Sequence, residues 1–90
     1  MSTAVSTVGS PVNLTASGAI SALPGALLGF YVNSTTSGTI VLKDGGASGT
    51  AISGTITPAV GWNAFPAVFT TSAYATIGAT INVTFIFAAG

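Results

Sequence analysis

The chain contains neither cysteine nor histidine, and its 90 residues include one basic and one acidic side chain, Lys43 and Asp44. Without cysteine there are no disulfides. Without histidine, and with a single side-chain carboxylate, the chain cannot build a zinc or calcium cage of its own. A serine or threonine nucleophile would have no histidine to activate it, and acid–base catalysis needs two tuned groups. We therefore predict no catalytic residues, no metal site and no cofactor.

The shortage of charge also excludes two classes of partner. One lysine and no arginine cannot neutralise the phosphates that drive nucleic-acid binding, and an electrostatic membrane-surface role fails for the same reason. The most apolar stretch, residues 19–32, contains Pro24, Gly25 and Gly29 and is shorter than the ~20 apolar residues of a spanning helix. The N-terminal sequence MSTAVSTVGSPVNL has no basic region and no continuous apolar core. We expect no signal peptide, and synthesis in the cytoplasm of a cell, where the protein is kept until it is assembled or released.

Apolar and small residues are what the chain has in abundance. Hydrophobic residues make up 49% of it and charged residues 2%, against about 25% charged in an ordinary domain. The formal net charge is +0, and near-zero net charge promotes association. A chain this short forms one domain whose own core is marginal, and without disulfides or metal the remaining way to stabilise it is oligomerisation. The composition predicts a surface that other copies or partners cover.

The secondary structure is predicted to be all-β. Threonine, valine, isoleucine and phenylalanine favour strands, and glycine and serine favour the turns between them. Apolar residues recur with a period of two, which is the spacing of a strand with one buried face. The sets predicted to share a face are Leu28, Phe30 and Val32; Ile40 and Leu42; Ile52, Gly54 and Ile56; Phe65, Ala67 and Phe69; and Ile81, Val83, Phe85 and Phe87.

Turn signals divide the chain into short strands. The polar run 33–38 is predicted to be a hairpin, and Asp44-Gly45-Gly46 a tight turn, because Asp-Gly and Gly-Gly supply residues with positive φ. Together the breaks predict about seven or eight short strands at close spacing, the pattern of an antiparallel β-sandwich or a small barrel. We expect residues 1–21 to form an N-terminal arm or edge strand, and residues 22–90 to form the sandwich domain.

Few residues stand out as sites. Lys43, Asp44 and Gly45 are predicted to form an exposed turn rather than a reactive pair. Trp62, Asn63, Tyr31 and Tyr74 are candidate interface residues. Trp62 with Asn63 would anchor a protein contact or stack on a sugar ring, and we favour the protein contact. Three Asn-x-Thr patterns begin at Asn13, Asn33 and Asn82, but such patterns arise by chance in a threonine-rich chain and do not predict glycosylation.

Three segments resemble small virion proteins of tailed bacteriophages: Gly29 to Gly45, Trp62-Asn63-Ala64-Phe65-Pro66 and Tyr74-Ala75-Thr76-Ile77-Gly78. The resemblance implies a jelly-roll-like sandwich that sits on the capsid surface of the virion as a decoration (cement) protein, commonly a homotrimer, with the major capsid protein as its partner. The alternatives are a carbohydrate-binding module of a fibre or spike, with Trp62, Tyr31 or Tyr74 as stacking platforms, and a tail component.

Overall fold

Residues 10–89, which the computed structural model describes, form six β-strands and no helix. All pairings are antiparallel and belong to one sheet. The predicted all-β class is confirmed, whereas the prediction of seven or eight short strands is wrong, because two of the strands are 20 and 17 residues long. The strands are β1 (Ser10–Leu14), β2 (Gly18–Ser21), β3 (Gly25–Asp44), β4 (Thr50–Ala51), β5 (Gly61–Phe69) and β6 (Ala73–Ala89).

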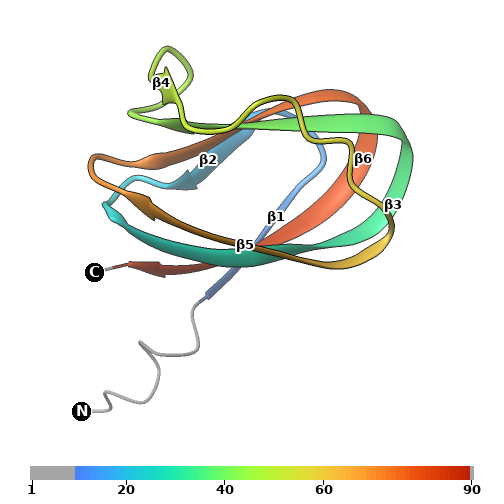
Figure 1. Cartoon of the computed structure of the whole chain (residues 1–90), viewed down its shortest axis with the longest axis horizontal. Coiled ribbons are helices and arrows are strands. Elements are labelled where there is room, and N and C mark those ends of the chain that lie inside the picture. Colours follow the sequence, from blue (N-terminus) through green and yellow to red (C-terminus); the bar gives the residue numbers. More distant parts are fainter. Residues whose placement is uncertain (1–9, 90) are drawn as a thin grey trace.

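The two long strands, β3 and β6, form the centre of the sheet. They pair along their whole length, from Gly25 opposite Ala89 to Asp44 opposite Ala73. Figure 1 shows them side by side and curving together through a bend, so that the sheet folds over on itself. The first half of each strand thereby comes to face the second half across the core.

The bend lies in the polar segment 33–38, where we predicted a hairpin; that prediction is wrong. β3 continues through the segment, with Ser34 opposite Asn82 and Thr36 opposite Thr80, and its register with β6 shifts on either side. One residue on each strand of the bend lies in the left-handed region: Ser37 at φ 57 and Ala79 at φ 56. Small polar side chains tolerate exposure on the outside of a bend, and so the polar run marks a change of direction rather than the end of a strand.

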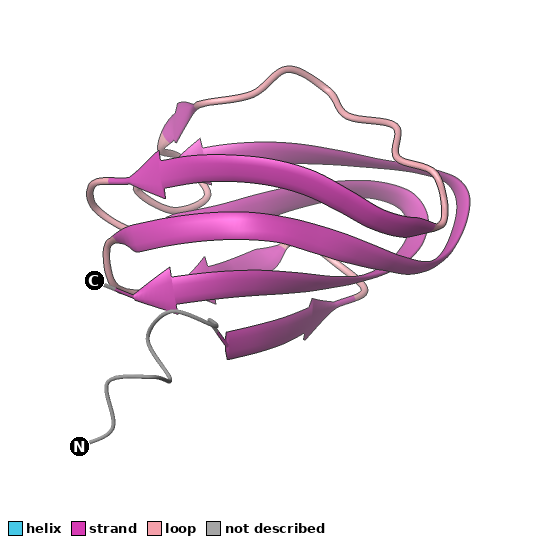
Figure 2. Ribbon diagram, turned by 60° about the horizontal axis from the view of Figure 1, so that its bottom comes forward, coloured by secondary structure: helices cyan, strands magenta, loops and turns pink. Residues whose placement is uncertain are grey.

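The four shorter strands extend the two sides of the central pair. β1 and β2 pair with opposite ends of β6, and β5 and β4 pair with opposite ends of β3 (Figure 2). Of the segment 1–21, for which we expected an arm or an edge strand, residues 10–21 supply β1 and β2, and residues 1–9 lie outside the described part. Pro11 lies in β1, whose one partner among the strands is β6; this fits the rule that proline is confined to edge strands.

Between β4 and β5 the chain follows β3 without forming a continuous strand. We predicted a strand over residues 50–57, but the strand ends at Ala51. Beyond it, the Ile52 N–H donates to the Leu42 carbonyl at 2.9 Å, and Ile56 forms an isolated bridge with Ile40. The Leu42 N–H donates to the Ser53 hydroxyl at 3.0 Å. In a continuous strand this N–H would donate to a backbone carbonyl instead. Ile56 packs on the core, whereas Ile52 is exposed.

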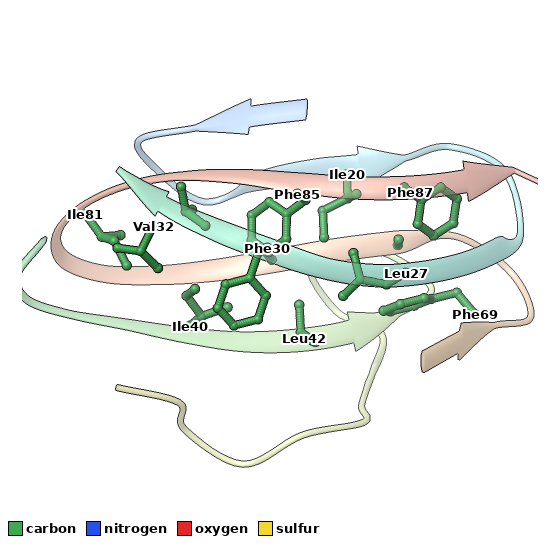
Figure 3. Packing of buried hydrophobic residues seen from close by; sticks show 13 residues of the cluster. Ile20, Leu27, Phe30, Val32, Ile40, Leu42, Phe69, Ile81, Phe85 and Phe87 are labelled. Carbon is green, nitrogen blue, oxygen red and sulfur yellow. The ribbon is translucent and has the colours of Figure 1, made fainter. Parts of the chain in front are cut away.

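The core lies between the two halves of the folded sheet. Figure 3 shows Leu27 and Phe30 from the first half of β3 and Ile40 and Leu42 from the second half pointing into one cluster. Phe30 and Phe85 pack with their ring centroids 5.6 Å apart. Burying each such side chain contributes about 1.5–3 kcal/mol, and no polar side chain in residues 10–89 is buried. The buried residues are Ile20, Leu27, Phe30, Val32, Ile40, Leu42, Phe69, Ala73, Ala75, Ile81, Val83, Phe85 and Phe87.

The predicted face is wrong in one strand segment. We grouped Leu28 with Phe30 and Val32, but Leu27 is the buried residue and Leu28 is 36% exposed. An irregularity in the ladder between Leu27 and Gly29 is the cause, because an inserted residue exchanges the two faces of a strand. The predicted inward faces of residues 38–43 and of the last strand are confirmed.

Candidate binding face

The outer surface of four strands carries a row of aromatic and amide side chains. Thr84 on β6 pairs with Tyr31 on β3, and Tyr31 pairs with Trp62 on β5. Asn13 on β1 extends the row on the other side of Thr84. Strand alternation turns these residues away from the core, since their neighbours in sequence point inward. The aromatic–amide face consists of Asn13, Tyr31, Asn33, Trp62, Asn82 and Thr84.

The indole ring of Trp62 lies directly over the backbone of β3. A Cβ atom added at Gly29 would come within 2.7 Å of Cζ2 and 2.9 Å of Cη2 of Trp62, closer than real Cβ contacts. The same Cβ atom would lie 2.6 Å from the Asn63 carbonyl oxygen, so glycine at this position makes room for both the ring and the neighbouring strand. Trp62 is 56% exposed and its register partner Tyr31 is 44% exposed. The two side chains form an accessible aromatic surface.

Beside the rings, three asparagines from three strands meet at one point. Asn13 Nδ2 donates to Asn82 Oδ1 at 2.8 Å and to Thr84 Oγ1 at 3.1 Å. Asn33 Nδ2 donates to the same two oxygens, at 3.1 and 3.0 Å. These bonds use Nδ2 of Asn13 and Asn33 and Oδ1 of Asn82. They leave Oδ1 of Asn13 and Asn33 and Nδ2 of Asn82 for other partners.

Comparisons of the chain with protein-family models, with curated proteins and with solved structures give no match. Within residues 10–89, no helix has the length and apolar character needed to cross a membrane. No pocket is present in this part of the chain either, so the aromatic–amide face is an open surface.

The structure brings together two of the four candidate interface residues. Tyr31 and Trp62 are neighbours, as described. Asn63 alternates with Trp62 along β5, and its Nδ2 donates to the carbonyls of Ala59 and Gly61 at 3.2 and 3.1 Å, which holds the start of β5. Tyr74 lies near the start of β6, opposite Lys43, in the other half of the folded sheet. Neither belongs to the aromatic–amide face.

The charged pair ends β3. The Asp44 carboxylate accepts the backbone N–H groups of Thr70 and Thr71, each at 2.9 Å, and that of Ser72 at 3.3 Å, as well as the Thr70 hydroxyl at 2.9 Å. The Thr70 and Thr71 N–H bonds are the main reason that the pKa of Asp44 falls to about 2. Lys43 Nζ donates to the Ala47 carbonyl at 3.1 Å. Asp44 therefore fastens the connection between β5 and β6 to the end of β3.

The predicted tight turn after Asp44 is confirmed by the positive φ values of its glycines. Gly45 and Gly46 have φ values of 105 and 94, which favour glycine. Gly45 is exposed, while Lys43 and Asp44 are half-buried. The role of Asp44 as an anchor for residues 70–72 has no signal in the sequence, because its partners lie in a distant segment.

Sequence reasoning missed the amide part of the face. Asn13, Asn33 and Asn82 each begin an Asn-x-Thr pattern, which we attributed to chance. Their shared position depends on how β1, β3 and β6 pair, and strand order is not encoded in the spacing of apolar residues. Gly29 was also missed, because the need for glycine arises from the Asn63 carbonyl and the Trp62 ring on another strand.

Proposed function

We propose that the chain is a jelly roll that serves as a non-enzymatic, homo-oligomeric decoration protein on a virus capsid. The strand pairings support the jelly roll. The bend divides β3 and β6 into two segments each, and with β1, β2, β4 and β5 the chain then has eight segments. Numbered along the chain, they pair in the orders 1-8-3-6 and 2-7-4-5. This nested order is that of a jelly roll, a fold used by viral capsid and lectin domains.

The observation that carries the functional proposal is an exposed apolar surface at the end of the molecule opposite the bend. Val68 on β5 is 73% exposed and Leu23, just before β3, is 61% exposed. Val68 pairs with Ala26 near the start of β3, and Leu23 lies just before that start, so Val68 and Leu23 are both at this end of the sheet. Charged residues normally protect such edge strands from pairing with other chains, and β5 has none. Pro66, two residues before Val68 on β5, is exposed as well, and we call Leu23, Pro66 and Val68 the apolar end.

Contact through the apolar end would stabilise a shell by burial of area. At ~25 cal/mol per Å², a few hundred Å² of apolar contact contributes several kcal/mol before the cost of association. Many copies on one capsid add such contacts by multivalency. Because no charge takes part, the contact is little affected by salt.

Light scattering on the purified protein tests the oligomer. We expect the mass of a trimer at both low and high salt. Val68→Lys places a charge in the apolar end and is expected to reduce the mass to that of a monomer. Val60→Lys is the matched control, since Val60 is similarly exposed (62%) but lies before the other end of β5. A monomeric wild-type protein, or a trimer unaffected by Val68→Lys, would contradict the proposal.

The place in a virion needs a separate experiment. Purified phage particles from the source lysate are labelled with an antibody against the protein and viewed by electron microscopy. Label over the heads supports decoration of the capsid. Label on the tails, or none on intact particles, contradicts it, and the first of these results would favour the tail component.

A further inference from the structure

We infer that the aromatic–amide face binds a neutral carbohydrate chain. The inference does not depend on the capsid role, because the face and the apolar end share no residue: Trp62 lies at the start of β5 and Val68 near its end. Three features of the face carry it: a pair of exposed aromatic rings on neighbouring strands, a set of amide groups beside them, and the lack of charge.

The aromatic pair provides the surface on which a sugar ring stacks. A pyranose ring has an apolar C–H face, which packs on the electron-rich face of an aromatic ring. Trp62 already lies against Gly29 on β3, which lowers the cost of ordering this side chain on binding. Tyr31, its direct neighbour on β3, widens the platform and adds a hydroxyl.

The amide groups provide hydrogen bonds for the sugar hydroxyls. Each amide has both a donor and an acceptor end. Asn82 and Thr84 fix the orientation of Asn13 and Asn33 through four bonds of 2.8 to 3.1 Å. The free amide atoms of these asparagines adjoin the rings, because Thr84 pairs directly with Tyr31. An apolar protein contact would bury these groups without partners, which is costly; a polyhydroxylated ligand would satisfy them.

The charge and shape of the face define the ligand further. The two charged side chains, Lys43 and Asp44, lie at the far end of β3, so that an ionic ligand finds no counter-charge. The row from β5 to β1 crosses four strands, or about 14 Å at the usual strand spacing. Since residues 10–89 contain no pocket, the ligand lies along the surface. An extended neutral oligosaccharide fits these requirements better than a single sugar.

The single tryptophan makes the site directly observable. Wild-type protein is titrated with hexasaccharides of β-1,4-linked glucose, N-acetylglucosamine and mannose, and its fluorescence is recorded. It is also incubated with insoluble cellulose and chitin. We expect a saturable change in Trp62 emission with at least one of these glycans, with an affinity that is the same at low and high salt.

Variants assign the binding to the face, measured by calorimetry or co-sedimentation. Trp62→Ala and Tyr31→Ala are expected to weaken binding about tenfold or more, and Asn82→Ala to weaken it as well. Gly29→Ala would bring a Cβ atom within 2.6 Å of the Asn63 carbonyl oxygen and 2.7 Å of the Trp62 ring. It therefore disturbs both the pairing of β3 with β5 and the ring, and it is expected to shift the Trp62 emission without ligand and to reduce affinity. Tyr74→Ala is the matched aromatic control on the other half of the sheet and is expected to leave affinity unchanged. Circular dichroism verifies that each variant is folded.

Three results would overturn the inference. The first is that no glycan of the panel, soluble or insoluble, binds the wild-type protein. The second is binding that persists unchanged in Trp62→Ala and Tyr31→Ala. The third is that Trp62→Ala lowers the oligomeric mass in light scattering, which would make this face a contact between copies. The mass of Val68→Lys tests the capsid proposal separately, so the two can fail independently.

Discussion

Asp44 shows how a chain with almost no charge uses its single side-chain carboxylate. Four donors from residues 70–72 surround it, and bonds from backbone N–H groups favour the ionised form. Its Asp-Gly-Gly turn was predictable, because local residues determine a tight turn. Its binding to residues 70–72 was not, because only the fold brings these residues near it.

The Asp44 bonds predict how stability depends on pH. The pKa of Asp44 is about 2 in the folded protein against an ordinary value of 3.8, so the unfolded chain takes up the proton first as the pH falls. The stabilisation is therefore complete above about pH 5 and is lost between about pH 4 and pH 2. We expect the melting temperature of the wild type to fall over this range. The melting temperature of Asp44→Asn is expected to be lower than that of the wild type at pH 7 and to change less between pH 7 and pH 2. Parallel melting curves for the two proteins from pH 7 to pH 2 would contradict this.

Among the elements, the bend of β3 and β6 was the hardest to predict. The alternation of Ile81, Val83, Phe85 and Phe87 correctly predicted a buried face, since nothing interrupts it. In residues 26–33 the same reasoning failed, because the irregularity between Leu27 and Gly29 exchanges the faces. A polar run has the same composition whether the chain turns back as a hairpin or bends within a long strand. The outcome depends on its partner, here the residues from Thr80 to Asn82.

The left-handed residue in the bend gives a prediction for β6. Ala79 has φ 56, where a Cβ atom costs about 1–2 kcal/mol and glycine is free of strain but loses more entropy on folding. We expect Ala79→Gly to raise the free energy of unfolding by about 0.5–1 kcal/mol, measured by urea denaturation. Ala75→Gly is the matched control in the same strand; Ala75 is buried, and its replacement is expected to destabilise. Equal losses in both variants would show that φ at residue 79 does not limit stability.

At the scale of the whole molecule, the long strands join both halves of the sheet into one cooperative unit. Phe85 and Leu42 come from opposite halves yet belong to one core. Phe85→Ala is expected to cost about 3–5 kcal/mol and Leu42→Ala about 2–5 kcal/mol. Each should lower one common transition, with circular dichroism and Trp62 fluorescence coinciding. Thr55→Ala, an exposed control, should stay within about 0.5 kcal/mol of the wild type. Two separate transitions would mean that the halves unfold independently.

The complete pairing of β3 with β6 also has a consequence for synthesis on the ribosome. β3 leaves the ribosome before β6. Each residue pair between the two strands therefore needs a residue that is made much later, and this holds even for Asp44 and Ala73, the pair closest in sequence. While the chain is growing, β3 can pair only with β4 and β5, and its other edge stays open. The sheet is therefore completed only after β6 has emerged. The hydrogen bonds from residues 70–72 to the Asp44 carboxylate position Ala73 opposite Asp44, which is the first pair of β3 with β6 to form.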